Sequence, residues 1–364
     1  MIRGHGGNIY ALARRLGCRA RDIIDMSSNV NPLGPMPEMM TRIQSHLEDM
    51  TALPEADSAG IIDAFARYHK VAPNVVLAGN GTTQLIYALP LALNLKTALI
   101  LSPTYSDYQD ACEMHGCRSV HLLSRAEADF QPDLDRLDAM AGEVGSVFVC
   151  NPNNPTGAIL EKTVLEKIIR KHPGTCFIVD ESYLPFVKAA DDFSMIRSDL
   201  PNLAVLNSMS KIFRIPGLRI GFIKSSLDII EKLQKFMLPW SVNSPAQVAV
   251  HYLMTENNKV DGFIHDTCRF LDGERKAFMD SFPHPSLIQW FDSPTSFLLG
   301  KLPTSVTAGC ICDALAEQKI LIRNCSNFIG LSDQYIRVSL KKPATNRLLS
   351  ASLLELTEKM TLSQ

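Results

Sequence analysis

Segment 207–221 contains a lysine and an arginine whose types and spacing suit covalent chemistry. Lys211 follows a short apolar run and the pair Ser208 and Ser210, and Arg219 follows within Pro-Gly-Leu-Arg. A lysine at the mouth of an α/β sheet forms a Schiff base when its neighbours lower its pKa. The serines and the planar donor fork of Arg219 suit a phosphate. The alternative for Ser-x-Ser-Lys alone is a solvated lysine beside an arginine ion pair, but the added Pro-Gly-Leu-Arg favours the covalent site.

Further polar side chains follow other short apolar runs. One run leads into a glycine turn at the start of a helical pattern, where free amides and the helix dipole attract an anion. Another ends in an Asp-Glu-Ser-Tyr segment, and a buried aspartate there needs a cationic partner. Taken singly, each of these segments also fits an ordinary turn or a half-buried side chain. The candidates are Gly81, Thr82, Thr83, Tyr105, Asn154, Asp180 and Tyr183.

One cofactor, pyridoxal 5′-phosphate, accounts for all of these residues together. Its protonated pyridine nitrogen would face Asp180, and its ring oxygen would lie near Asn154 and Tyr183. The ring would stack on Tyr105, and the aldehyde carbon would meet Lys211. The phosphate would contact Gly81, Thr82, Thr83, Ser208 and Arg219.

The elements that must position these residues form an alternating pattern. Near-continuous Val/Ile/Leu runs separated by amphipathic stretches predict a mostly parallel sheet covered by helices on both faces. Ligands of such sheets bind outside the carboxyl ends of the strands, where most candidates fall. The predicted strands are 75–78, 98–101, 120–123, 147–150, 177–179, 204–206 and 221–223.

Three regions are predicted along the 364 residues. Residues 1–35 hold two glycine- and asparagine-rich clusters that can close over an anion, and residues 36–240 form the large α/β domain. Residues 241–364 form a smaller α+β domain with strands at 287–290, 296–299, 320–323 and 335–338. Arg323 and Arg337 lie on the last two of these strands, so each needs an anionic partner from the protein or from a ligand.

Composition excludes several classes of protein. A hydrophobic content of 46% and a charged content of 20% indicate a soluble globular chain. A net charge of −2 gives no basis for binding nucleic acid or an anionic membrane. No apolar run reaches the roughly 18 residues of a spanning helix, and no signal peptide is recognisable. Nine cysteines without framework spacing indicate reduced thiols in the cytoplasm and no metal site.

The order of four motifs resembles that of fold-type I pyridoxal-phosphate enzymes over essentially the whole chain. The motifs are Asn154 to Gly157, Asp180 with Tyr183, Ser208 to Lys211, and Pro216 to Arg219. The resemblance implies a homodimer with active sites at the subunit interface. Its nearest branches are the histidinol-phosphate aminotransferases and the L-threonine-O-3-phosphate decarboxylases of cobalamin synthesis.

The decarboxylase branch is favoured by the start His5-Gly6-Gly7-Asn8, which is similar to that family's sequence. Carried over, the resemblance makes Lys211 the Schiff-base lysine, with Asp180, Tyr183 and Asn154 beside it in catalysis. Arg323 and Arg337 would hold the carboxylate and phosphate of the substrate, in an order the sequence leaves open. The residues expected to close the phosphate end are His5, Gly7 and Asn31.

The expected reaction is decarboxylation of L-threonine O-3-phosphate to (R)-1-amino-2-propanol O-phosphate. The alternatives are a histidinol-phosphate-type aminotransferase, a decarboxylase of L-serine O-phosphate, and a non-catalytic cofactor-binding protein. One departure from the family concerns Leu53, which stands where a tyrosine usually reaches the cofactor phosphate of the partner subunit. Thr51 or Ser58 are the neighbouring hydroxyls that could replace it.

Overall fold

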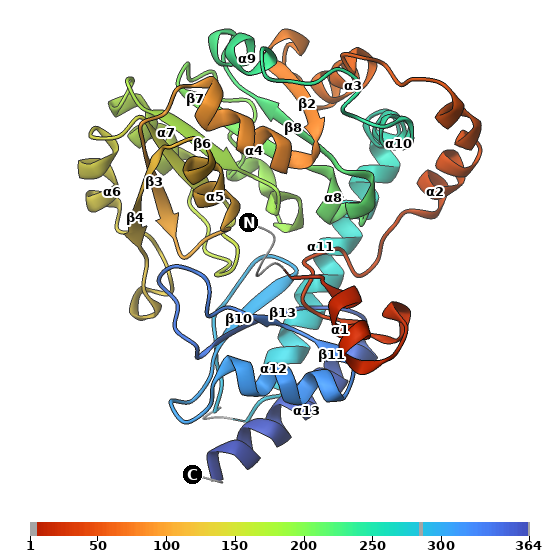
Figure 1. Ribbon diagram of the computed structural model, residues 1–364, viewed down its shortest axis with the longest axis vertical. Helices are drawn as coiled ribbons and strands as arrows, with labels where there is room; N and C mark the ends of the chain where they lie inside the picture. The colour runs from red at the N-terminus through yellow and green to blue at the C-terminus, as the bar shows by residue number, and fades with distance from the viewer. Residues whose placement is uncertain (1–5, 284–286, 363–364) are drawn as a thin grey trace.

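The computed structural model describes residues 6–283 and 287–362, and its larger part is built on a seven-stranded sheet (Figure 1). The strand order is β2-β8-β7-β6-β5-β3-β4, with β8 antiparallel to both neighbours and the other pairs parallel. All seven predicted strands of the large domain are confirmed. Their bounds are β2 Val76–Asn80, β3 Thr97–Ser102, β4 Arg118–Leu123, β5 Ser146–Cys150, β6 Cys176–Asp180, β7 Leu203–Ser208 and β8 Ile220–Lys224.

Both faces of this sheet are buried. Successive residues of a strand point to opposite faces, so Leu99 joins one core cluster while Ala98 and Ile100 join the other. This double burial explains why the strands read as unbroken apolar runs. The covering helices are α4 Gly81–Ala92, α5 Asp107–Met114, α6 Leu134–Ala141, α7 Lys162–Lys171 and α9 Leu227–Gln234, and the four-residue α8 Met209–Ile212 follows β7.

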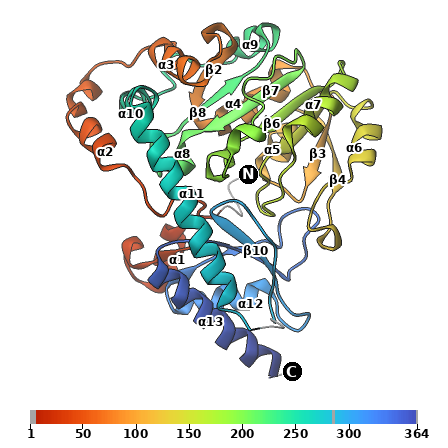
Figure 2. The same ribbon diagram turned by 180° about the vertical axis from the view of Figure 1, so that it is seen from behind.

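The smaller part contains an antiparallel sheet in the order β12-β13-β10-β9. Its strands are β9 Gln289–Trp290, β10 Phe297–Lys301, β12 Arg323–Asn324 and β13 Tyr335–Ser339. Helices α12 Ala308–Glu317 and α13 Pro343–Leu362 belong to the same part, and α11 Asn257–Asp280 runs from the large part into it (Figure 2). The strand predicted at 320–323 is divided: β11 Ile320–Leu321 pairs with β1 Ile24–Asp25, and β12 pairs with β13.

The first described residues pack on this smaller part. Helix α1 Ile9–Leu16 buries Leu12 and Ala13 against Ala316, and β1 extends β11 in parallel. Helices α2 Pro37–Gln44 and α3 Ala59–His69 then lead to the large sheet, where α10 Ser244–Thr255 packs against both. The predicted boundaries after residues 35 and 240 stay predictions.

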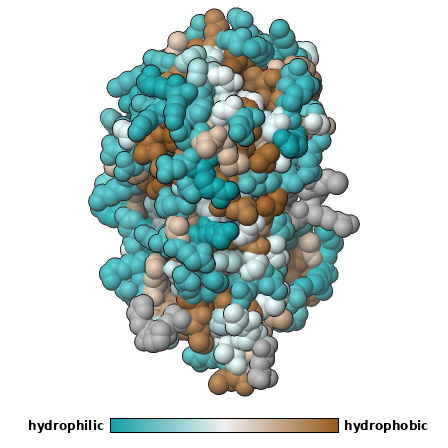
Figure 3. Space-filling model, turned by 90° about the vertical axis from the view of Figure 1, so that its left-hand side faces the viewer, coloured by the Kyte–Doolittle hydropathy of each residue, from teal (hydrophilic) through white to brown (hydrophobic). Residues whose placement is uncertain are grey.

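The surface on the β4 and α6 side is mostly hydrophilic, with hydrophobic side chains in separate patches (Figure 3). Among the described residues, no helix is at once long and apolar enough to cross a bilayer.

Candidate active site

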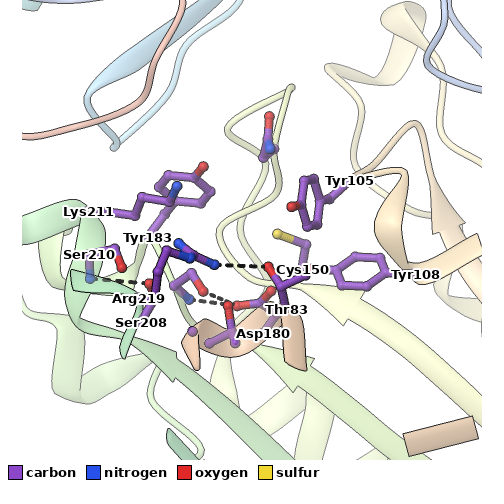
Figure 4. Close-up of a pocket in the computed structure, with 14 residues that line it drawn as sticks. Thr83, Tyr105, Tyr108, Cys150, Asp180, Tyr183, Ser208, Ser210, Lys211 and Arg219 are labelled. Atoms are coloured by element: carbon purple, nitrogen blue, oxygen red, sulfur yellow. Dashed lines mark hydrogen bonds between the residues drawn. The ribbon is translucent and has the colours of Figure 1, made fainter. Parts of the chain in front are cut away.

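A pocket at the carboxyl ends of the large-sheet strands brings together every residue predicted to bind the cofactor. Figure 4 shows Lys211 and Tyr105 on opposite sides of this pocket, with Asp180 below them. Parallel strands end at one edge of the sheet, so the segments after β3, β5, β6 and β7 meet there. The predicted residues that line the pocket are Gly81, Thr82, Thr83, Tyr105, Asn154, Asp180, Tyr183, Ser208, Ser210, Lys211 and Arg219.

Lys211 enters the pocket from α8. The Ser208 hydroxyl caps this short helix by accepting a hydrogen bond from the Ser210 amide at 3.3 Å. Burial, followed by the positive charges of Arg219 and Arg337, lowers the pKa of Lys211 from 10.5 to about 8. A larger fraction of this amine is therefore neutral near physiological pH than of an exposed lysine, and the neutral amine is the nucleophile.

This pKa predicts the pH dependence of cofactor capture by the protein freed of its cofactor. Below the pKa of Lys211 the neutral fraction falls about tenfold per pH unit, so the rate of covalent capture should rise with pH and level off above about 8. Stopped-flow absorbance during mixing with pyridoxal 5′-phosphate measures the rate. Free lysine amide under the same conditions is the reference, and a shared midpoint near 10.5 would contradict the assignment.

Asp180 sits at the floor of the pocket and is 4% exposed. Its Oδ1 accepts hydrogen bonds from the amide and the hydroxyl of Ser182, and its Oδ2 accepts one at 2.8 Å from the Tyr108 hydroxyl. Burial raises the pKa of Asp180, while the bonds from Ser182 and Tyr108 lower it. Donors on both oxygens favour the carboxylate form and fix its orientation.

The end of the pocket near Gly81 has the form of an anion cradle. Gly81 has a φ of +73° and begins α4, and a Cβ added to it would lie 2.4 Å from Nη2 of Arg219. A Cβ on Gly221 would lie 2.5 Å from the Thr82 amide. Only glycines therefore allow the guanidinium and the first amides of α4 to converge on one ligand. This cradle, the lysine and the buried carboxylate fit the phosphate, aldehyde and pyridine nitrogen of pyridoxal 5′-phosphate.

A second pocket adjoins the first and shares Tyr105, Asn154, Tyr183 and Lys211 with it. Its further lining includes Gly6, Ser27, Ser28, Asn29, Ser106, Arg323, Phe328 and Arg337.

Arg337 is 5% exposed in this second pocket. Its Nη1 donates to Oδ1 of Asn154, its Nη2 donates to the Ser27 carbonyl at 2.7 Å, and its Nε has no partner among the described residues. Burial lowers the pKa of Arg337. No acidic side chain of the described part forms an ion pair with it in the structure, so an anionic ligand would compensate its charge.

Arg323 lies directly opposite Arg337 in the ladder of β12 and β13. Its Nη2 donates to Oδ1 of Asn327 at 2.6 Å, and its guanidinium lies 5.0 Å from the ring centre of Phe328. Burial lowers the pKa of Arg323 to about 10. Two like charges opposite each other on neighbouring strands destabilise a sheet, so the pair indicates a site for more than one anionic group.

The structure brings together only some of the residues predicted to bind the substrate. Arg323 and Arg337 lie in the pocket, whereas His5 lies outside the described residues. Gly7 donates its amide to the Ser27 hydroxyl at 2.7 Å, and its neighbour Gly6 lines the pocket instead.

Asn31 is placed elsewhere than predicted. It is fully buried, and its amide nitrogen donates to the Ile212 carbonyl and to the Thr267 hydroxyl, both at 2.8 Å. Its Oδ1 accepts from the Leu33 amide. These bonds occupy both ends of the side chain, so Asn31 holds α8 in place, and Asn29 is the asparagine of this turn that lines the pocket.

The sequence analysis missed three residues that line the first pocket: Tyr108, Cys150 and Ser182. Tyr108 follows Tyr105 by three residues, and Ser182 follows Asp180 by two residues, a spacing that often lets a hydroxyl bond a neighbouring carboxylate. The spacing to Asp180 could have indicated Ser182, whereas nothing in the sequence pointed Tyr108 toward the aspartate.

Comparisons with known proteins show the family of this chain. Residues 21–353 match the family model of aminotransferase class I and II. The threonine-phosphate decarboxylase of Salmonella typhimurium is 31% identical over 353 residues, which are 96% of this chain and 95% of that protein. A bifunctional adenosylcobalamin biosynthesis protein of Leptospira interrogans is 28% identical, and the match covers 94% of this chain but 40% of that longer protein.

Relatives of a second kind also match. The histidinol-phosphate aminotransferase of Methanocaldococcus jannaschii is 25% identical over 90% of this chain and 88% of its own length.

Among solved structures, the L-threonine-O-3-phosphate decarboxylase of Porphyromonas gingivalis superposes with a TM-score of 0.80 and 27% identity, covering 94% of this chain and all of that one.

Proposed function

Because the chain belongs to the aminotransferase class I and II family, we propose that it is a pyridoxal 5′-phosphate-dependent decarboxylase. Its substrate is L-threonine O-3-phosphate, and its product is (R)-1-amino-2-propanol O-phosphate, within cobalamin synthesis. The observation that carries the proposal is the cross-strand pair Arg323 and Arg337 beside Lys211. A phosphorylated amino acid carries a carboxylate and a phosphate to meet both cations, whereas histidinol phosphate carries only a phosphate.

Arg337 is the cation that binds the carboxylate in this proposal. It touches Asn154 and lies close enough to Lys211 to lower the pKa of that lysine, so it is the arginine nearer the reacting carbon. Its planar guanidinium can donate two parallel hydrogen bonds to one carboxylate. The bond to the Ser27 carbonyl and the contact with the Phe297 ring at 5.4 Å hold the fork in place.

Arg323 is the cation that binds the phosphate. It lines the second pocket, where it contacts Asn327 and Phe328, and unlike Arg337 it is not among the charges that lower the pKa of Lys211. A phosphate held there lies at the far end of the substrate from the α-carbon. Binding of the phosphate by Arg323 can therefore help to orient the carboxylate at the reacting carbon.

The cofactor, when bound, supplies an electron sink for the pair of electrons left when carbon dioxide departs. Asp180, oriented by Ser182 and Tyr108, would hold a proton on the pyridine nitrogen and so stabilise the negative charge that develops. Tyr183 and Asn154 would donate to the ring oxygen. Lys211 would deliver a proton to the α-carbon as general acid.

A substrate panel tests the proposal. The purified protein is incubated with threonine phosphate, serine phosphate and histidinol phosphate, each with and without a keto acid. Carbon dioxide released from threonine phosphate without a keto acid is the expected result. Amine transfer that requires a keto acid would favour the aminotransferase.

Discrimination against serine phosphate rests on one methyl group, so we expect kcat/KM for threonine phosphate to be only about 10- to 200-fold higher. A protein that binds the cofactor but converts none of these compounds would be the non-catalytic alternative.

The proposed enzyme is a homodimer with shared active sites. Two exposed apolar side chains belong to segments near the phosphate cradle: Leu53 is 76% exposed and Trp240 is 48% exposed. The Trp240 amide donates to the Ala56 carbonyl at 3.0 Å, and the Asn80 side chain donates to the Ser241 carbonyl at 3.0 Å next to Gly81. Exposed apolar groups of this kind favour a protein interface, here a second copy of the chain.

Replacing Leu53 by glutamate should weaken this dimer at least about tenfold, because the new charge would be buried without a partner. Analytical ultracentrifugation over a concentration series measures the dissociation constant. Leu362, which is 86% exposed at the end of α13, offers the matched control Leu362→Glu. Equal dimer affinities of both variants would contradict the placement of the interface.

A further inference from the structure

We propose that Ser339 and Asn29 form a hydrogen-bonded relay that positions the hydroxyl of Tyr183 toward the ring oxygen of the cofactor. Both are positioning residues that act through Tyr183. The inference rests on the cofactor assignment and on no particular substrate, so it stands or falls independently of the decarboxylation.

The relay consists of three buried side chains from different parts of the chain. The Ser339 hydroxyl donates to Oδ1 of Asn29 at 2.6 Å, and Nδ2 of Asn29 donates to the Tyr183 hydroxyl at 3.3 Å. Ser339 is fully buried, Asn29 is 4% exposed and Tyr183 is 7% exposed. Ser339 lines neither pocket, and within the described part of the chain its hydroxyl is linked to the site through Asn29.

The direction of these bonds determines what Tyr183 can do. An amide nitrogen is only a donor, so Asn29 occupies a lone pair of the phenolic oxygen and leaves the phenolic proton available to another acceptor. The oxygen that accepts from Asn29 is also a stronger donor, because hydrogen bonds in a chain polarise one another. In the pocket that Tyr183 lines, the matching acceptor is the ring oxygen of pyridoxal 5′-phosphate.

Ser339, the first residue of the relay, lies on strand β13 together with Arg337, which we propose binds the substrate carboxylate. Arg337 and Ser339 are two residues apart and so lie on one face of the strand. Arg337 bonds Asn154 directly, and Ser339 reaches Tyr183 through Asn29. Both predicted donors to the ring oxygen are thus held from the same strand of the smaller part.

The bound cofactor itself provides the readout. A weaker donor at Tyr183 leaves more negative charge on the ring oxygen, and the nitrogen of Lys211 beside it then keeps its proton to higher pH. The pH midpoint of the cofactor's visible absorbance, recorded without substrate, should therefore rise. The other ionisable groups facing Tyr183 are Arg337, Asp180, Cys150 and Tyr105, and the variants below leave them in place.

Three variants and a control test the relay. Tyr183→Phe should raise the midpoint most, and Ser339→Ala should raise it by about half a pH unit. Asn29→Ala should lie between them and serves as the second variant if Ser339→Ala does not fold. The control is Ser296→Ala: Ser296 is also fully buried, its carbonyl accepts from the Leu340 amide, and its hydroxyl has no partner among the described residues. It should not shift the midpoint.

A double variant separates the relay from a general packing role. In the Tyr183→Phe background the Ser339→Ala change should add no further shift, because its effect passes through the missing hydroxyl. Thermal unfolding of each variant confirms folding. The proposal is overturned if folded Ser339→Ala and Asn29→Ala leave the midpoint unchanged, or if the Ser339→Ala shift is as large without the Tyr183 hydroxyl as with it.

Discussion

Replacing Lys211 by alanine is expected to abolish covalent attachment of the cofactor and to lower the decarboxylation rate by at least about 10²–10⁴-fold. The lysine is the only amine among the residues that line the first pocket, and the proposed function assigns it the roles of nucleophile and general acid. The first pocket keeps its cradle and Asp180, so the variant should still bind the cofactor non-covalently. Borohydride reduction followed by mass spectrometry measures the attachment.

The control for this experiment is Lys188→Ala, because Lys188 is exposed and outside both pockets. It should remain labelled after reduction and retain full activity. Stable labelling of the Lys211→Ala protein at another lysine, with activity intact, would refute the assignment of Lys211.

Replacing Arg337 by methionine should lower kcat/KM for threonine phosphate by at least about 10²-fold, because the substrate carboxylate then loses a charged bidentate partner. Arg323→Met should cause a loss of similar size through the phosphate. The roles of the two arginines can be distinguished with a ligand that has the phosphate but lacks the carboxylate, namely 1-amino-2-propanol O-phosphate. Its binding, measured by calorimetry, should weaken in Arg323→Met and remain within a few fold in Arg337→Met.

The reverse pattern would exchange the roles of the two arginines. Arg337 also bonds Asn154 and Ser27, so the melting temperature of its variant has to be compared with that of Arg323→Met. A ligand affinity that falls equally in both variants would contradict separate subsites.

The large sheet and the cofactor pocket could be predicted from sequence because one constraint fixes both. A strand buried on both faces must be apolar throughout, and its polar continuation then marks the edge where ligands bind. This rule placed Lys211 and Asp180 at the sheet edge, and the Ser-x-Ser-Lys and Pro-Gly-Leu-Arg motifs singled out the lysine. The predicted fold, that of fold-type I pyridoxal-phosphate enzymes, is confirmed by the family match and by the strand order.

The substrate end was less predictable because turns carry no such constraint. Asn29 and Asn31 lie in the same Ser-Asn-Val-Asn-Pro turn, and only tertiary contacts decide which side chain faces the pocket. The residues 320–323 read as one strand, but a change of partner from β1 to β13 divides them. The local sequence pattern predicts that a segment is extended, but it does not predict which strand the segment pairs with.

The close approach of Gly6 to the substrate pocket has a practical consequence for producing the protein. A Cβ on Gly6 would lie 2.6 Å from the Ser27 carbonyl and 3.4 Å from Nη2 of Arg337. An affinity tag fused ahead of Met1 would therefore be joined only five residues before Gly6, which lines the same pocket as Arg337. Helix α13 ends at Leu362, at the opposite end of the molecule from the large sheet (Figure 1), so we expect a purification handle placed after it to leave Lys211 accessible.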